Sequence, residues 1–398
     1  MKIHEIELRK IFDSRGEPTI EVIVIDGEGR RFTAAVPSGK SKGTREVSTF
    51  SFEDARVAVD KIRETVAAKV FEGVGEIDAF LLGIDGTPEK KILGGNVMLG
   101  VSIAAARALA HGMKREVWEL IREEYFSDIV EERVPLILSN FVNGGGHANN
   151  NLDLQEYLVI ARTNGSVIKT VGKLIDLYRA TGEFLKKQYK LNNIPIGDEG
   201  GYSLDFPDNF EPLSILEALI DENDLENEFI LGLDAAASHF GSEKGYVLEK
   251  KKYTREKLVE KYKEYFKKSK LLLSIEDAFG ENDTEGFIQL RKAVPEKWVV
   301  GDDLTTTNAK EIENHAGEGA INAVIIKPNQ IGTIAEACGA IQAARRHGVK
   351  IIVSHRSGET EDAFVIELAK ACAADGVKIG APVKERLIKF NELIRLYS

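Results

Sequence analysis

Short apolar runs that end abruptly in polar or charged residues recur along most of this chain, and they limit the folds that it can adopt. Examples are FILGLDAAAS, LLLSIEDAF, KWVVGDDL, AVIIKPNQ and KIIVSHRSG, with helical stretches between them. Strands that are apolar throughout are buried on both faces, and their alternation with helices indicates a parallel sheet. Eight or so such units predict a closed β/α barrel over residues 126–398 in preference to an open doubly wound sheet.

The preceding part of the chain follows a different pattern. Over residues 3–33, β-branched runs alternate with turn signals and predict a three-stranded antiparallel meander. Over residues 51–124 the apolar period becomes helical, and Ser51 is placed to cap the first helix. We therefore expect an α/β chain in which a small α+β domain, residues 1–125, precedes the barrel.

The composition argues against several classes of protein. With 64 acidic and 53 basic side chains in 398 residues, the net charge is −11, whereas a nucleic-acid binder needs clustered Lys and Arg. No apolar stretch reaches the roughly 18 residues of a membrane-spanning helix, and the first residues lack the apolar core of a signal peptide. We therefore expect no membrane span, a cytoplasmic location, and buried thiols at Cys338 and Cys372 in place of a disulfide.

Six residues with ionisable side chains fall at or just after the ends of apolar runs. They are Asp234, Glu276, Asp302, Lys327, His355 and Lys378. Their spacing matches one strand, one helix and two loops per unit, so they should converge on the carboxyl-terminal rim of the barrel, where such folds carry catalytic groups.

Three of these residues, Asp234, Glu276 and Asp302, are carboxylates that would be costly to bury together without a cation. Oxygen ligands without His or Cys select a hard ion, and a few carboxylates completed by water and substrate suit Mg²⁺. A helix cap or a salt bridge explains any single acid more simply, but three in register favour a metal site. The adjacent Asp277 and Asp303 should point elsewhere and either support the ligands by hydrogen bonds or cap helices.

Lys327 and Lys378 are flanked by apolar residues, in IIKPN and VKIGA, which indicates that both enter the barrel mouth. A lysine beside a second lysine and a divalent cation has its ammonium form disfavoured, which lowers its pKa and makes the amine available as a base. Alternatively, both lysines balance the carboxylates in an ion network, and the residues alone support the two interpretations about equally.

Two loops carry groups that could contact a substrate or an ion bound with it. His355, Arg356 and Ser357 lie in SHRSGET, residues 354–360, where charged and hydroxyl donors on a glycine-containing loop suit phosphate; pairing of Arg356 with a rim acid is the alternative. The lid loop, VPSGKSKGTRE at residues 36–46, could close over the mouth with Ser38 as a ligand to a substrate-bound ion. An interdomain loop that is merely mobile is the alternative.

Two glycine-rich acidic turns, NGGGHANNNLDLQEY and GDEGG, add His147, Glu156 and Glu199 to the candidate site. Glycines let the backbone approach a ligand closely, and neighbouring carboxylates can relay a proton. On its own, GDEGG is equally compatible with an ordinary turn.

The motifs occur together, and in order, in one known family. IFDSRGEPT, LGGNVMLGVS, NGGGHANNNLDLQEY, GDEGG, SIEDAF, IKPNQIGT and SHRSGETEDAF closely resemble motifs of the enolases, with coverage over about residues 3–397. The resemblance implies a lyase of glycolysis and gluconeogenesis, the phosphopyruvate hydratase that converts 2-phosphoglycerate to phosphoenolpyruvate. The lid loop departs from the family, because it reads SGKSKG where SGASTG is usual.

The resemblance also implies roles for individual residues. Asp234, Glu276 and Asp302 would bind one Mg²⁺, and Ser38 would meet a second that arrives with the substrate, giving two per active site. The groups implied in catalysis are Lys327 as the base at C2, Glu199 helped by Glu156 at the 3-hydroxyl, and His355, which with His147 would close around the substrate. The groups implied in substrate binding are Arg356 and Ser357 for the phosphate, Lys378 for the carboxylate, Ser38, Glu156 and His147.

Other functions remain compatible with the sequence. Another enolase-superfamily reaction on a carboxylic acid would keep the three acids and a lysine but need no phosphate clamp. A catalytically altered paralogue could act as a binding protein. The family resemblance further implies a homodimer or homo-octamer, with Arg15 and Glu17 as candidate interface groups; a salt bridge within their turn is the alternative.

Overall fold

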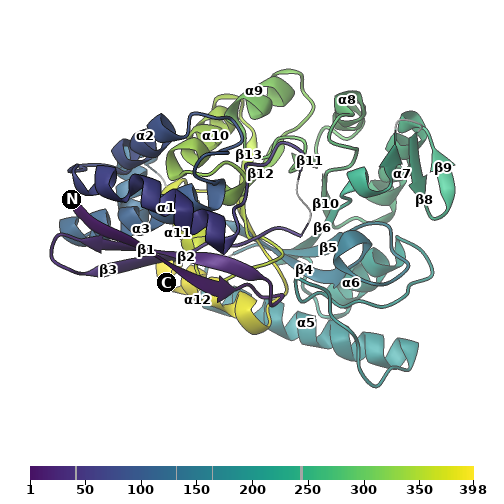
Figure 1. Ribbon diagram of the computed structural model, residues 1–398. Coiled ribbons are helices and arrows are strands. Elements are labelled where there is room, and N and C mark those ends of the chain that lie inside the picture. Colours follow the sequence, from purple (N-terminus) through teal and green to yellow (C-terminus); the bar gives the residue numbers. More distant parts are fainter. Residues whose placement is uncertain (41–42, 131, 164, 243–244) are drawn as a thin grey trace.

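A small sheet with helices lies beside a barrel whose strands run through the middle of the molecule (Figure 1). The computed structural model describes residues 1–40, 43–130, 132–163, 165–242 and 245–398. Ser41 and Lys42 of the lid loop therefore lie outside the described residues.

The N-terminal part begins with the predicted meander. Strands β1 (Ile3–Phe12), β2 (Pro18–Asp26) and β3 (Arg31–Ala35) form an antiparallel sheet in that order. The helices that follow are α1 (Phe52–Ala67), α2 (Val74–Ile84), α3 (Gly95–Met113) and α4 (Val117–Tyr125). Ser51 caps α1 as predicted, because its Oγ accepts a hydrogen bond from the backbone N–H of Asp54 at 3.1 Å.

The rest of the chain forms the predicted closed barrel. Its strands, in chain order, are β4 (Leu136–Asn143), β5 (Glu156–Ala161), β6 (Phe229–Asp234), β10 (Leu272–Glu276), β11 (Trp298–Gly301), β12 (Ala323–Ile326), β13 (Lys350–Ser354) and β14 (Gly376–Ile379). Around the ring their order is β10, β11, β12, β13, β14, β4, β5, β6. Chain order and ring order agree, so each strand pairs with the next strand of the barrel.

One strand corrects the expectation of a wholly parallel sheet. β5 runs antiparallel to both of its neighbours, β4 and β6. Parallel neighbours need a crossover, usually a helix, whereas the segment between β4 and β5 contains only a single 3₁₀ turn, Gly145–His147. The sequence pattern did not reveal this, because β5 is as apolar as the parallel strands.

Helices and a small sheet surround the barrel. The helices are α5 (Val167–Tyr189), α6 (Glu211–Glu222), α7 (Arg255–Lys268), α8 (Thr284–Ala293), α9 (Ala309–Gly317), α10 (Ile334–Arg346), α11 (Phe364–Ala371) and α12 (Leu387–Tyr397). The small sheet consists of β7 (Gly241–Ser242), β8 (Gly245–Leu248) and β9 (Lys251–Tyr253). Across the described ranges, every helix is too short or too polar to cross a membrane.

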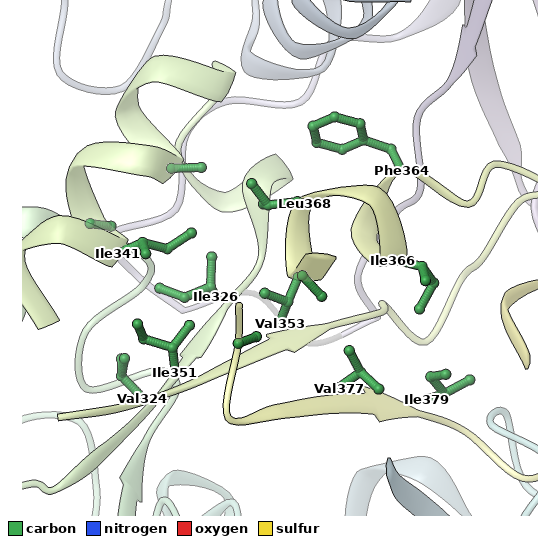
Figure 2. Packing of buried hydrophobic residues seen from close by; sticks show 14 of the residues in the cluster. Val324, Ile326, Ile341, Ile351, Val353, Phe364, Ile366, Leu368, Val377 and Ile379 are labelled. Atoms are coloured by element: carbon green, nitrogen blue, oxygen red, sulfur yellow. The ribbon is translucent and has the colours of Figure 1, made fainter. Parts of the chain in front are cut away.

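Alternate residues of the barrel strands face two apolar cores, which explains why the strands are apolar throughout. Ala323 and Ile325 of β12 belong to a cluster inside the barrel. Val324 and Ile326 of the same strand belong to the outer cluster, and Figure 2 shows them with side chains of the covering helices, including Ile341 of α10. Cys338 and Cys372 are buried and free, as predicted.

A buried carboxyl group joins the small domain to the barrel. Asp78 of α2 is completely inaccessible to solvent, and it accepts a hydrogen bond from the backbone N–H of Ala335, in the first turn of α10, at 2.7 Å. The backbone N–H of Ile334 donates to Ser102 Oγ of α3 at 3.2 Å. Burial, only partly offset by hydrogen bonds from Ser102 and Ala335, raises the pKa of Asp78 to about 7.

The raised pKa predicts that the interface weakens as pH rises. Because the folded protein binds a proton at Asp78 more tightly than the unfolded chain, stability is lost between about pH 4 and pH 7. We expect Asp78→Asn to flatten that part of the pH profile and to raise the free energy of unfolding at pH 8 by roughly 1–4 kcal/mol. Urea titrations of both proteins at several pH values measure this, with Asp176→Asn on the exposed face of α5 as control. Equal pH profiles would contradict it.

Candidate active site

The side chains predicted for the rim lie at the carboxyl ends of their strands. Asp234 and Glu276 end β6 and β10, Asp302 and Lys327 directly follow β11 and β12, and His355 directly follows β13. A cavity opens at this rim. Ten of the twelve predicted site residues line it: His147, Glu156, Glu199, Asp234, Asp302, Lys327, His355, Arg356, Ser357 and Lys378. The two others are Glu276 and Ser38. Glu276 contacts Lys378, which lines the cavity, and Ser38 exchanges backbone hydrogen bonds with Gly358, next to Ser357.

Lys378 forms ion pairs with three of the rim carboxylates. Its Nζ lies 2.8 Å from Glu276 Oε1, 3.1 Å from Asp234 Oδ2 and 3.0 Å from Glu156 Oε2, and all four side chains are buried. Burial disfavours the ammonium, but the carboxylates outweigh burial and raise the pKa of Lys378. Burial and then Asp234 raise the pKa of Glu276. The ammonium thus compensates part of the repulsion between these acids.

Lys327 forms an ion pair with Asp302. Burial favours the neutral amine of Lys327, as do Arg356 and Lys378, but the Asp302 carboxylate outweighs them and raises the pKa of Lys327. The lowering expected from the sequence requires a divalent cation beside Lys327, whereas the ion pair with Asp302 by itself favours the ammonium. Both lysines form the ion network that the sequence left open as an alternative.

Two acids of the cavity, Glu156 and Glu199, lie beside His147 and His355. His147 Nδ1 is 3.4 Å from Glu156 Oε1 and 3.7 Å from Glu199 Oε1, and His355 Nε2 is 3.5 Å from Glu199 Oε2. Burial and Glu199 raise the pKa of Glu156, whereas the contacts with His355 and His147 overcome burial and lower the pKa of Glu199. Two neighbouring carboxyls with pKa values pushed apart can hold and pass a single proton.

The carboxylates of the rim fit a hard cation. Asp277, Asp302 and Asp303 bring ligand oxygens within 4.8 Å of one another, and Asp302 also belongs to the predicted trio. Both oxygens of Asp277 accept backbone hydrogen bonds, from Asp302 at 2.9 Å and Asp303 at 2.8 Å, so Asp277 supports the loop that carries Asp302. Oxygen-only ligands of this kind suit Mg²⁺.

The lid loop packs against the SHRSGET loop. Ser38 and Gly358 exchange backbone hydrogen bonds at 2.8 and 2.9 Å, and Ser357 Oγ accepts one from the N–H of Lys40 at 2.9 Å. Ser38 Oγ donates to Asp13 Oδ2 at 2.6 Å, next to the salt bridge between Arg15 and Asp13 within their turn.

Lys40, which belongs to the unusual SGKSKG sequence, contacts the opposite loop. Its Nζ lies 2.8 Å from Asp198 Oδ2 in the GDEGG loop, residues 197–201. Of the two added lysines, this one therefore joins the lid to the loop that carries Glu199.

Several neighbours of the site were not singled out from the sequence. Arg356 pairs with Glu46 at 3.0 Å, both side chains buried, and Asn329 Oδ1 accepts from Arg356 Nη1 at 2.9 Å. Gln155 Nε2 donates to Asp234 Oδ2 at 3.3 Å. The position of Gln155 directly before Glu156 could have drawn attention to it. The salt bridge between Glu46 and Arg356 joins two domains, so no local sequence pattern indicates it.

Comparisons with known proteins match two family models to most of the chain. Residues 131–398 match the family model of the enolase C-terminal TIM barrel domain, and residues 3–121 match that of the enolase N-terminal domain. The chain belongs to the enolase family. It is 39% identical to the enolase of Pyrococcus furiosus over 98% of this chain and 93% of that protein. It is 37% identical to the enolase of Methanopyrus kandleri, over 99% and 95% of the two chains.

Membership of the enolase family confirms the fold and the enzyme class expected from the sequence. Enolases are phosphopyruvate hydratases, which are lyases of glycolysis, and the enolase barrel with its small N-terminal domain is the architecture described above.

Proposed function

We propose that this enolase-family chain dehydrates 2-phosphoglycerate to phosphoenolpyruvate, and catalyses the reverse hydration, with Mg²⁺ bound at the rim. In the forward direction the bond between C2 and its hydrogen breaks, the proton passes to Lys327 Nζ, and the electron pair forms the C2–C3 double bond as the 3-hydroxyl leaves. Glu199, helped by Glu156, gives that hydroxyl a proton, so that it departs as water.

The observation that carries the proposal is the placement of a lysine and a carboxyl pair on opposite walls of one cavity. β12, which precedes Lys327, and β5, which begins with Glu156, are four places apart in the ring of eight strands. A substrate between them can lose a proton toward one wall and a hydroxyl toward the other. Neither side chain then has to perform both proton transfers.

The remaining cavity residues suit the two anionic ends of the substrate. The guanidinium of Arg356 and the hydroxyl of Ser357 offer donors for the phosphate. Lys378 and the two histidines, His147 and His355, offer cationic or hydrogen-bonding groups for the carboxylate and for closure around the substrate. Ser38 would have to exchange its bond to Asp13 for a ligand bond, which a movement of the lid loop would allow.

For the metal, we propose Asp234, Glu276 and Asp302 as ligands of one Mg²⁺ and Ser38 as a ligand of a second. Bound Mg²⁺ would neutralise the negative charge that builds up on the substrate carboxylate when the C2 proton leaves. Support comes from the oxygen-only chemistry of these side chains and from the burial of Asp234, Glu276 and Asp302.

The decisive experiment follows phosphoenolpyruvate absorbance after 2-phosphoglycerate is added to the enzyme with Mg²⁺. We expect turnover, a rate at least about tenfold lower in EDTA, and recovery when Mg²⁺ is restored. Glycerate, which lacks the phosphate, should not react. Turnover of glycerate or of another carboxylic acid, without turnover of 2-phosphoglycerate, would favour a different superfamily reaction; no turnover of any of them would favour a binding protein.

The proposal retains the organisation expected from the sequence. This comprises domains at residues 1–125 and 126–398, a cytoplasmic location, and assembly as a homodimer or homo-octamer. Family membership supports these expectations, and a sedimentation measurement distinguishes the two assemblies.

A further inference from the structure

A buried arginine at the start of the last helix contacts two of the loops that carry cavity residues. Arg386 caps α12 and is only 1% exposed. It follows the barrel strand that carries Lys378, and sequence patterns gave it no role.

The guanidinium of Arg386 donates to backbone carbonyls of two different loops. Nη1 donates to the carbonyl of Arg356 at 3.0 Å, and Nη2 to that of Ser357 at 2.7 Å. Nη2 also donates to the carbonyl of Asp198, the residue before Glu199, at 3.1 Å. One planar group thus ties the SHRSGET loop to the GDEGG loop.

The space around this guanidinium is closely filled. A Cβ atom at Gly380 would lie 2.5 Å from the carbonyl oxygen of Glu199, 3.1 Å from Arg386 Nε and 3.2 Å from His355 Cε1. The backbone of Glu199 and the side chains of His355 and Arg386 therefore meet at one glycine. A displacement of the guanidinium would disturb the packing around Gly380, which Glu199 and His355 share.

A buried arginine is costly, and apolar residues of similar volume often stabilise a protein more. Its nearest carboxylate atom, Glu385 Oε1, is 3.5 Å from Nε and belongs to the adjacent residue. Structural stability alone therefore gives a weak reason for an arginine at this place. Lysine could not replace it, because a single ammonium lacks the planar fork that reaches carbonyls on two loops.

We propose that Arg386 is a positioning residue that fixes the distance between the phosphate-binding loop and the Glu199 loop. A substrate held by its phosphate at Arg356 and Ser357 then presents its 3-hydroxyl to Glu199. This inference rests on the proposed function. It concerns only the step at the 3-hydroxyl, because in the described part of the chain the hydrogen bonds of the Arg386 guanidinium go to the SHRSGET and GDEGG loops and not to the segment that carries Lys327.

The test compares two rates on the same variant, Arg386→Lys. We expect dehydration of 2-phosphoglycerate to fall about 10- to 100-fold, because small displacements of a catalytic group are costly. Exchange of the C2 proton with deuterated solvent, followed by NMR, should stay within about threefold of the wild-type rate. A merely structural role would lower both rates together, in proportion to the folded fraction. Arg386→Met provides a second variant, and urea unfolding shows whether each protein is folded at the assay temperature.

Arg107→Lys is the matched control. Arg107 also joins distant segments, since its guanidinium contacts Asp362 and the carbonyl of Thr33, but it contacts neither loop. We expect its two rates to change in parallel. An equal fall of both rates in Arg386→Lys, or no fall in dehydration, would overturn the inference. If the wild-type protein neither exchanges nor dehydrates 2-phosphoglycerate, the proposed function fails instead.

Discussion

Lys327→Met is expected to slow exchange of the C2 proton of 2-phosphoglycerate with solvent by about 10²- to 10⁴-fold, the range for loss of a general base. Methionine has nearly the length of lysine but no amine, so the cavity keeps its shape. Dehydration should fall by at least the same factor, because the hydroxyl cannot leave before the electron pair at C2 is available. Proton exchange is measured by NMR in deuterated buffer, and dehydration by phosphoenolpyruvate absorbance.

Removal of Lys327 also leaves Asp302 without its buried cationic partner, so stability must be followed separately. Lys350→Met is a suitable control, because Lys350 pairs with Asp375 at 3.0 Å and begins β13 at the opposite end of the barrel. We expect that variant to exchange and dehydrate at nearly wild-type rates. Undiminished exchange in a folded Lys327→Met protein would remove Lys327 as the base.

Glu199→Gln is expected to lower dehydration without lowering exchange of the C2 proton. Glutamine keeps the size of the side chain but cannot supply a proton, so dehydration should fall by about 10²- to 10⁴-fold while C2 exchange continues. Asn140 Nδ2, which donates to Glu199 Oε2 at 3.2 Å, can still find an acceptor in the amide oxygen. The two rates therefore separate proton removal at C2 from loss of the 3-hydroxyl.

Glu183→Gln on the exposed surface of α5 controls for the loss of a carboxylate as such. Its two rates should equal those of the wild-type protein. If Glu199→Gln loses exchange and dehydration to the same extent, Glu199 and Lys327 do not have separate roles, and the proposed mechanism is wrong.

The barrel could be predicted because its strands have a simple physical signature. Residues such as Val324 and Ile325 are both buried, one outside and one inside the ring, so the whole run must be apolar. The first polar residue after each run then marks the rim. This rule placed Asp302, Lys327 and His355 correctly at the strand ends without any tertiary information.

Pairings between distant segments could not be predicted in the same way. Lys378 reaches Glu276 across the ring, since β14 and β10 are four places apart, and Arg356 meets Glu46 of the other domain. Such pairings depend on the closed barrel and on how the domains dock. The raised pKa of Lys327 likewise depends on its ion pair with Asp302, which the sequence left open as one of two interpretations.

The reversed strand β5 has a consequence for how this site can change. In a parallel unit the chain leaves the mouth after each strand and returns at the far end, whereas here it stays at the mouth from Asn143 to Glu156. That hairpin contributes His147, Gln155 and Glu156 to the cavity in one continuous stretch. Insertions or deletions in this segment would reshape the entrance while every barrel strand keeps its register, so new substrate preferences could arise there with little cost to folding.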